Sequence, residues 1–168
     1  MLRWPPPHEV VPVGVEYLVR AARVTDVERL VALCDAASWT AEGGSPLNAS
    51  DLLRSLVYLP QASVIVAEAR RDIVGGAVLA LRPSVRAGGF VGTVDLLVVD
   101  PRVDVDRVHS ALLEEVLRSA RNKACAVVEA IASDDPAERT RWEDMGFREA
   151  GPRIYRSVAT AKTAARHP

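Results

Sequence analysis

Apolar and polar positions divide the chain into short blocks, some with the two-residue period of a strand and some with the period of a helix. The strand-like blocks are rich in β-branched residues and are bounded by charged residues or by turn residues. Two of these blocks are joined by a short turn at Arg71-Asp72, which predicts an antiparallel hairpin. Strands are predicted at 17–22, 62–69, 73–81, 90–99, 124–130 and 148–157.

Helical blocks alternate with these strands, and several of them carry end signals. Thr25 and Glu28 have the spacing of a capping box, and Gly146 stands where a helix ends on a left-handed residue. One face of the longest block is apolar and consists of Val108, Leu112, Leu113 and Val116. Helices are predicted at 25–37, 50–57, 107–122 and 135–145.

The order of the blocks is strand, two helices, three strands, helix, strand, helix and final strands, which predicts one α/β (α+β) domain over residues 17–158. A chain of 168 residues is long enough for such a domain to bury a substantial core. Residues 1–16 are rich in proline and predict an extended N-terminal arm, which can pack along the domain or onto a second subunit in a homodimer. Residues 159–168 are expected to form a polar C-terminal tail.

Composition and charge exclude several classes of protein. The formal net charge is -1, so nothing draws the whole chain to nucleic acid or to an anionic membrane. No apolar run approaches the length of a membrane span, and the first residues lack the apolar core of a secretory signal, so we expect a cytoplasmic protein. Cys34 and Cys125 lie far apart in apolar surroundings and predict buried free thiols, with no metal site.

Four segments carry a resemblance to a known family. They are Arg20–Val27, Val66–Gly75, Leu97–Pro101 and the Trp142–Phe147 run of Trp-Glu-Asp-Met-Gly-Phe. In this order they resemble the GNAT (N-acetyltransferase) superfamily over about 17–158. The resemblance implies a mixed, mostly antiparallel central sheet flanked by helices, which splays between the 90–99 and 124–130 strands.

The same resemblance implies a ligand, acetyl-CoA or another acyl-CoA, in the cleft where the sheet splays. The backbone of Leu97, Val98 and Val99 is expected to pair with the pantetheine arm. The following loop is expected to hold the pyrophosphate with backbone amides at the start of a helix. The family's loop pattern, Arg/Gln-x-x-Gly-x-Gly/Ala, falls here on Asp104, Val105, Asp106, Arg107, Val108 and His109.

This loop has the length of the family pattern but different residues. Arg107 and His109 replace the two small residues that would let the backbone approach a phosphate. Asp104 and Asp106 add negative charge beside an anionic ligand, and one such pair about 5 Å apart costs roughly 3 kcal/mol at an effective dielectric constant of about 20. Arg102 and Arg107 offset part of that repulsion. Alternatively, the two aspartates cap the helix and occupy the amides that a phosphate would use.

Asp95 is the candidate general base, because many family members place a carboxylate near this position that accepts the amine proton through water. Val94, Leu96 and Val98 alternate with it and are expected on the opposite face. The alternative for Asp95 is an ion-paired strand residue. Glu129 is expected as a second carboxylate facing the cleft region, and Glu68 as solvated surface.

A general acid is harder to assign. Trp142 stands where the family often has a tyrosine, and an indole cannot supply a proton at useful pH, so we expect a core or groove-lining aromatic. Tyr155 is a possible substitute on a late strand. His109 has suitable chemistry, but its position predicts a residue on the cofactor side or at the surface.

Two functions follow from these observations. The first is an acyl-CoA-dependent N-acyltransferase, which transfers an acetyl group to a primary amine of a small molecule or protein. The second is a catalytically impaired binding, regulatory or dimerisation module that binds acyl-CoA weakly or not at all. A nucleic-acid contact through Lys162 and Arg166 in the tail is weaker, because the net charge is near zero. The acceptor loops implied by the fold, 38–47 and 151–155, carry no distinctive charge.

Overall fold

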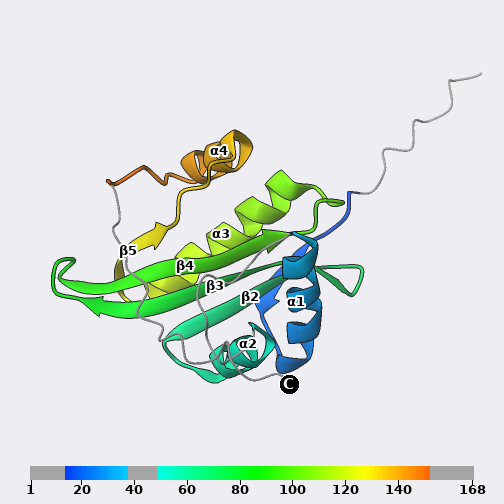
Figure 1. Ribbon diagram of the computed structural model, residues 1–168, viewed down its shortest axis with the longest axis horizontal. Coiled ribbons are helices and arrows are strands. Elements are labelled where there is room, and N and C mark those ends of the chain that lie inside the picture. Colours follow the sequence, from blue (N-terminus) through cyan, green and yellow to red (C-terminus); the bar gives the residue numbers. More distant parts are fainter. Residues whose placement is uncertain (1–13, 38–48, 152–168) are drawn as a thin grey trace, which may run out of the picture.

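The computed structural model describes residues 14–37 and 49–151 (Figure 1). Most of the expected N-terminal arm, the 38–47 loop, the strand positions from 152 to 157, Tyr155 and the 159–168 tail lie outside these residues. The described elements, in chain order, are β1 (Leu18–Ala21), the 3₁₀ turn η1 (Val24–Asp26), α1 (Val27–Ala36), α2 (Ala49–Tyr58), β2 (Ala62–Ala69), β3 (Asp72–Ser84), β4 (Gly89–Val99), α3 (Val105–Asn122), β5 (Cys125–Ala130) and α4 (Pro136–Asp144).

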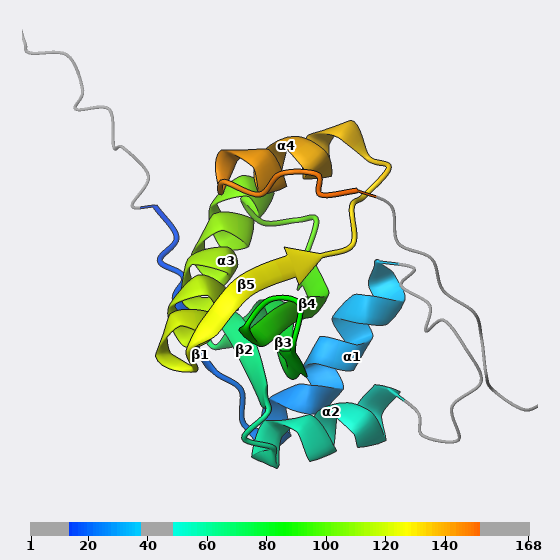
Figure 2. The same cartoon turned by 90° about the vertical axis from the view of Figure 1, so that its left-hand side faces the viewer.

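The described strands form one sheet in the order β1-β2-β3-β4-β5. Pairing is antiparallel from β1 to β4, whereas β5 runs parallel to β4, since α3 carries the chain back across the sheet. Helices α1 and α2 cover one face and α3 covers the other (Figure 2). The predicted fold class, a mixed and mostly antiparallel sheet flanked by helices, is confirmed. Residues 148–151 form no strand.

Two apolar clusters, one on each face of the sheet, make up the core. Glycines at the centre of β3 let both helices approach. A Cβ added at Gly76 would lie 2.5 Å from Leu30 Cδ1 of α1, and one added at Gly75 would lie 3.1 Å from Val108 Cγ1 of α3. Both helices therefore pack directly against the β3 backbone, and α3 does so through its N-terminal half.

The sequence placed most elements well and missed some local details. The predicted capping box of Thr25 and Glu28 is wrong, because η1 precedes α1 and the Asp26 carboxylate instead accepts the Arg23 backbone N–H at 2.7 Å. Both cysteines are free thiols; Cys34 is buried, which raises its pKa to about 11, while Cys125 is only half-buried. Among the described residues no group of side chains could hold a metal ion, and no helix is long and apolar enough to span a membrane.

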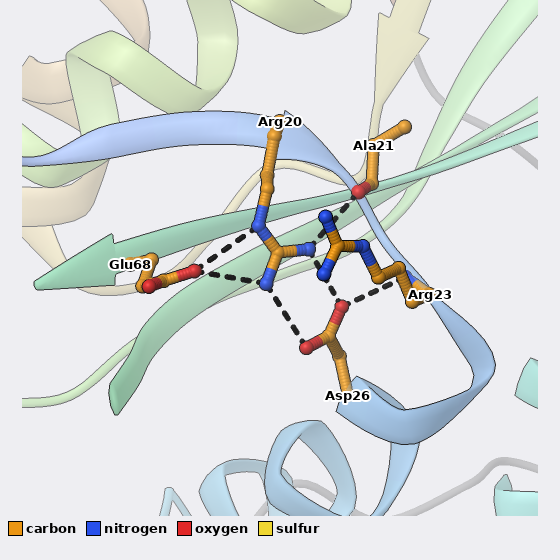
Figure 3. Close-up of polar contacts among 5 residues, drawn as sticks. All are labelled: Arg20, Ala21, Arg23, Asp26 and Glu68. Atoms are coloured by element: carbon orange, nitrogen blue, oxygen red, sulfur yellow. Dashed lines mark hydrogen bonds and ion pairs between the residues drawn. The ribbon is translucent and has the colours of Figure 1, made fainter. Parts of the chain in front are cut away.

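An ionic cluster ties the edge strand β1 to the rest of the fold (Figure 3). The Arg20 guanidinium donates to both Asp26 oxygens, at 2.7 and 3.1 Å, and to Glu68 Oε2 at 2.9 Å from Nη2 and 3.1 Å from Nε. The prediction that Glu68 is a solvated surface residue is therefore wrong. Asp26 also holds the Arg23 N–H, so its carboxylate joins β1 to the start of η1, and Arg20 extends the cluster to Glu68 of β2.

The β2–β3 turn consists of Arg70 and Arg71, one residue earlier than predicted, because Ala69 pairs with Asp72. Both arginines have positive φ, 51° and 68°, as the two central residues of a type I′ hairpin turn do, and asparagine and glycine are better suited to this conformation. Replacing them with Asn-Gly is expected to raise the free energy of unfolding by about 1 kcal/mol. Chemical denaturation measures the change. Arg86→Asn removes an exposed arginine outside this turn, and an equal gain there would show that charge rather than backbone strain is responsible.

Candidate functional site

The sheet opens at the carboxyl end of β4. Pairing between β4 and β5 runs from Phe90↔Cys125 to Val94↔Ala130 and goes no further, although β4 continues to Val99. Its last residues pair only with β3 among the described strands. In an antiparallel pair, the backbone groups of alternate residues point away from the partner strand. The backbone of Leu97–Val99 therefore presents N–H and C=O groups along an open edge beside α3.

Asp95 lies where the two strands part. Val78 pairs with Leu96 and Leu79 pairs with Val94, so Asp95 is the extra residue of a β-bulge, and its side chain is exposed. The prediction that Val94 and Leu96 share a face is wrong, because the extra residue shifts the alternation: Val94 packs on the α3 side and Leu96 on the α1 side. Within the described residues Asp95 has no ion pair.

The start of α3 is already hydrogen-bonded within the chain. Asp104 is the N-cap of α3, which agrees with the alternative that the aspartates of this loop cap the helix. Its carboxylate accepts the Arg107 N–H at 3.2 Å. The Asp104 N–H itself donates to Tyr17 Oη at 3.3 Å, and the Val108 N–H donates to the Asp104 carbonyl. Asp106 does not cap the helix but pairs with Arg141 of α4 at 2.6 Å. Three of the amides expected to bind pyrophosphate therefore have partners.

The arginines of this loop are also engaged within the chain. Arg102 donates to both oxygens of Asp100, a buried carboxylate that sequence reasoning missed, at 3.0 and 2.7 Å. Asp100 also accepts the Arg102 backbone N–H at 3.0 Å, a local bond that fixes the turn after β4. The Arg107 guanidinium donates to the Val15 carbonyl at 3.0 Å and lies 5.2 Å from the centre of the Tyr17 ring. In the sequence, the signal for the turn built around Asp100 is the Asp-Pro pair that follows an apolar strand.

Asp100 makes the stability of this loop dependent on pH. Its hydrogen bonds with Arg102 lower its pKa to about 2, so the stabilisation is complete above about pH 4 and is lost as the pH falls toward 2. Asp100→Asn is expected to lower the free energy of unfolding by about 1–2 kcal/mol at pH 7. Urea denaturation of both proteins at pH 7 and near pH 2.5 checks this, since the difference between them should shrink in acid. A difference independent of pH would contradict the assignment.

His109 of α3 and Trp142 of α4 form a buried pair. Their rings are edge-on with centroids 5.4 Å apart, and Phe147 packs against the indole in the same manner at 4.8 Å. His109 is only 2% exposed, so the alternative that it lies at the surface is wrong. Burial, and then the nearby Arg141, lower its pKa, so the imidazole is neutral at pH 7.

This pair holds unpartnered polar atoms. Of the buried side-chain nitrogen and oxygen atoms in the described part of the chain, those without a hydrogen-bond partner are His109 Nδ1, His109 Nε2 and Trp142 Nε1. Trp142 belongs to the same core cluster as Leu97 and Val99, so the pair lies on the side of the sheet where α3 meets the open edge of β4. A neutral imidazole and an indole together contain two N–H donors and one acceptor, and none of them has a partner among the described residues.

Glu129 lies on β5 opposite Thr93 of β4, away from α3. The Thr93 hydroxyl donates to Glu129 Oε1 at 3.1 Å, and Arg82 of β3 donates to the same oxygen at 3.1 Å. The neighbours Val128 and Ala130 pack on the α3 side, so Glu129 and Thr93 belong to the opposite face. Glu129 is thus held in a polar cluster close to the point where the strands part.

The structure brings the predicted site residues together at one end of the sheet. The bulge residue Asp95, the β4 edge at 97–99 and the start of α3 at 104–109 follow one another around the opening between β4 and β5. Within this set Val108 is fully buried, so its side chain belongs to the core. The arrangement is that of a GNAT fold: a mixed sheet splayed after a bulge in β4, with α3 starting beside the open edge.

Solved structures bear out this class of fold. An aminoglycoside N-acetyltransferase in complex with CoA is 22% identical with a TM-score of 0.73, over 89% of this chain and 100% of that one. A Trypanosoma brucei acetyltransferase is 22% identical with a TM-score of 0.68, over 85% of this chain and 100% of that one. A transcriptional regulator from Bacillus halodurans is 18% identical with a TM-score of 0.71, over 85% of this chain and 100% of that one.

At such identities the likeness establishes the fold. The chain has the GNAT fold, and its described strands and helices follow the order that the sequence motifs predicted. Comparison with protein-family models and with curated proteins gives no match. The chemistry of this protein must therefore be inferred from the residues around the opening between β4 and β5.

Proposed function

We propose that this protein transfers an acyl group from an acyl thioester to an amine. One observation carries the proposal: β5 leaves β4 at Val94, and β4 continues for five residues whose outer backbone edge pairs with no other described strand and begins at the exposed carboxylate of Asp95. Many solved structures of this fold are acetyltransferases, and one of them holds CoA, which supports the same class of reaction here.

The residues at the opening suit the binding of a thioester with an amide-containing arm. When bound, such a thioester supplies the acyl group. The backbone of Leu97–Val99 can hydrogen-bond the amides of the arm as a further strand would, and N–H groups along this edge can polarise the reacting carbonyl. The start of α3 does not suit a pyrophosphate, because its capping carboxylate and Tyr17 already occupy amides there.

Asp95 supplies the base in this proposal. An amine nucleophile loses one proton when its nitrogen takes the acyl group, and an exposed carboxylate at the mouth of the opening can accept that proton through a water molecule. Asp95 has no competing ion pair among the described residues. The proton on the departing sulfur has no assigned donor, since the Trp142 indole does not release its proton at useful pH.

Titration calorimetry with acetyl-CoA and with CoA tests the binding half of the proposal. A saturable heat at ligand concentrations up to about 1 mM is expected. A thiol-release assay with a panel of primary amines then tests transfer, and release without amine serves as the background. Absence of binding by every acyl thioester would refute the proposal and leave a module that shares the fold without the chemistry.

A further inference from the structure

The start of α3 is a poor site for a pyrophosphate for two independent reasons. The first is occupancy: the Arg107 N–H is held by the Asp104 carboxylate and the Asp104 N–H by Tyr17 Oη. A phosphate could take these amides only by breaking both bonds. Breaking the N-cap bond alone costs about 1 kcal/mol, before any repulsion between the phosphate and the freed carboxylate.

The second reason is charge. The carboxylates of Asp100, Asp104 and Asp106 balance the guanidiniums of Arg102, Arg107 and Arg141, so the loop offers a pyrophosphate no excess positive charge. Arg29, which also approaches Asp100, is in turn balanced by Asp72. Arg102 is committed to the buried Asp100, and Arg141 to Asp106. The Asp106 carboxylate is 80% exposed and stands in the first turn of α3, where a pyrophosphate would need a cation.

The neighbouring region has the opposite character, since its hydrogen-bonding groups are neutral and lack partners within residues 14–37 and 49–151. The open edge of β4 presents backbone groups at Leu97–Val99. On the same side of the sheet, below the surface, the buried pair holds the two ring nitrogens of His109 and the indole N–H of Trp142. A buried polar group without a partner costs about 1–3 kcal/mol. The amides of a pantetheine arm are uncharged and contain both N–H and C=O groups, so they suit the exposed backbone groups of this edge, and an arm that moved the packing over the pair would give its ring atoms partners as well.

We propose that the acyl donor is recognised through its pantetheine arm alone, so that an acyl-pantetheine thioester lacking the adenosine diphosphate end serves as well as acyl-CoA. This inference rests on the proposed function and specifies its donor. The same acylated pantetheine arm occurs in free acyl-phosphopantetheine and, covalently attached, on an acyl carrier protein. The balance of atoms is that of any aminolysis: the C–S bond breaks, the C–N bond forms, and the amine proton ends on the thiol or in solvent.

Affinity measurements with CoA, 4′-phosphopantetheine and pantetheine test the inference directly, by calorimetry on the full chain. We expect the three dissociation constants to agree within about fivefold and to share one dependence on salt concentration, because no phosphate is bound. A loss of fiftyfold or more on removing the adenosine diphosphate end would overturn the inference and leave the proposed function standing. If no ligand bound, CoA included, both would fall.

Variants of the buried pair provide a second readout. His109→Phe keeps a ring against Trp142 but removes both nitrogens, and we expect it to weaken CoA and pantetheine equally, by tenfold or more. His109→Gln restores a donor and an acceptor and should recover part of that loss. Arg118→Ala on the exposed side of α3 is the control and should leave affinity unchanged. Unchanged pantetheine affinity in folded His109→Phe would overturn the role of this pair.

The two sources of the arm are separated by a transfer assay. Acetyl-phosphopantetheine and acetylated acyl carrier protein are compared as donors at equal concentration, with acetyl-CoA as the reference. Higher kcat/KM with the carrier would support a carrier-borne arm as the source, and equal kcat/KM for all three would support the free thioester. Transfer from acetyl-CoA alone would overturn the inference.

Discussion

Asp95→Asn is expected to lower the turnover of acyl transfer by at least about 100-fold, the lower bound of what a positioned base contributes. Asparagine keeps the size and the hydrogen-bonding oxygen of the side chain but cannot accept a proton. Asp95 is the exposed residue of the β4 bulge and contributes to neither core cluster, so the fold should be unaffected. Thiol release at saturating acyl donor measures the turnover, and a thermal melt of each variant checks that the fold is unaffected.

Two further variants separate a base from a charge that only attracts the amine. Asp95→Glu returns the proton acceptor and should recover part of kcat, whereas a residue that binds the amine would mainly change KM. Glu114→Gln removes an exposed carboxylate from α3 and is the matched control. Turnover above one-third of the original in Asp95→Asn would exclude Asp95 as the base and direct attention to Glu129, the other carboxylate near the opening.

The sequence predicted the architecture because each element carries its own periodic signal. The apolar stripe of the 107–122 helix and the β-branched runs at 62–69 and 90–99 appear as α3, β2 and β4 with bounds that differ by at most two residues. The N-cap role of Asp104 was also predictable, since an aspartate before a helical stripe makes a bond to the next turn that depends on local chain geometry alone.

What the sequence did not predict depends on residues far apart in the chain or on a single inserted residue. The bulge at Asp95 is one extra residue in an otherwise regular strand, and only the pairing with β3 defines it. The burial of His109 depends on Trp142, which is 33 positions further on and belongs to another helix. The same holds for Glu68, which looks like an exposed strand residue until β1 places Arg20 beside it.

The ionic cluster around Arg20 supports the second large prediction. Asp26→Ala is expected to lower the free energy of unfolding by about 2–4 kcal/mol. It removes a nearly buried carboxylate and leaves the groups bonded to that carboxylate without a partner. The groups that lose this partner are the guanidinium of Arg20, whose side chain is 20% exposed, and the Arg23 N–H (Figure 3). Urea denaturation at pH 7 measures the loss.

The pH dependence distinguishes this ionic explanation from a simple loss of packing. The hydrogen bond with Arg20 lowers the pKa of Asp26, so its contribution is present above about pH 4 and disappears as the carboxylate is protonated in acid. The difference between the two proteins should therefore narrow below pH 4. Asp35→Ala, which removes an exposed aspartate from α1, should change stability by less than about 0.5 kcal/mol. An Asp26→Ala loss that is as small as the Asp35→Ala loss would mean that β1 is held by its strand pairing with β2 rather than by this cluster.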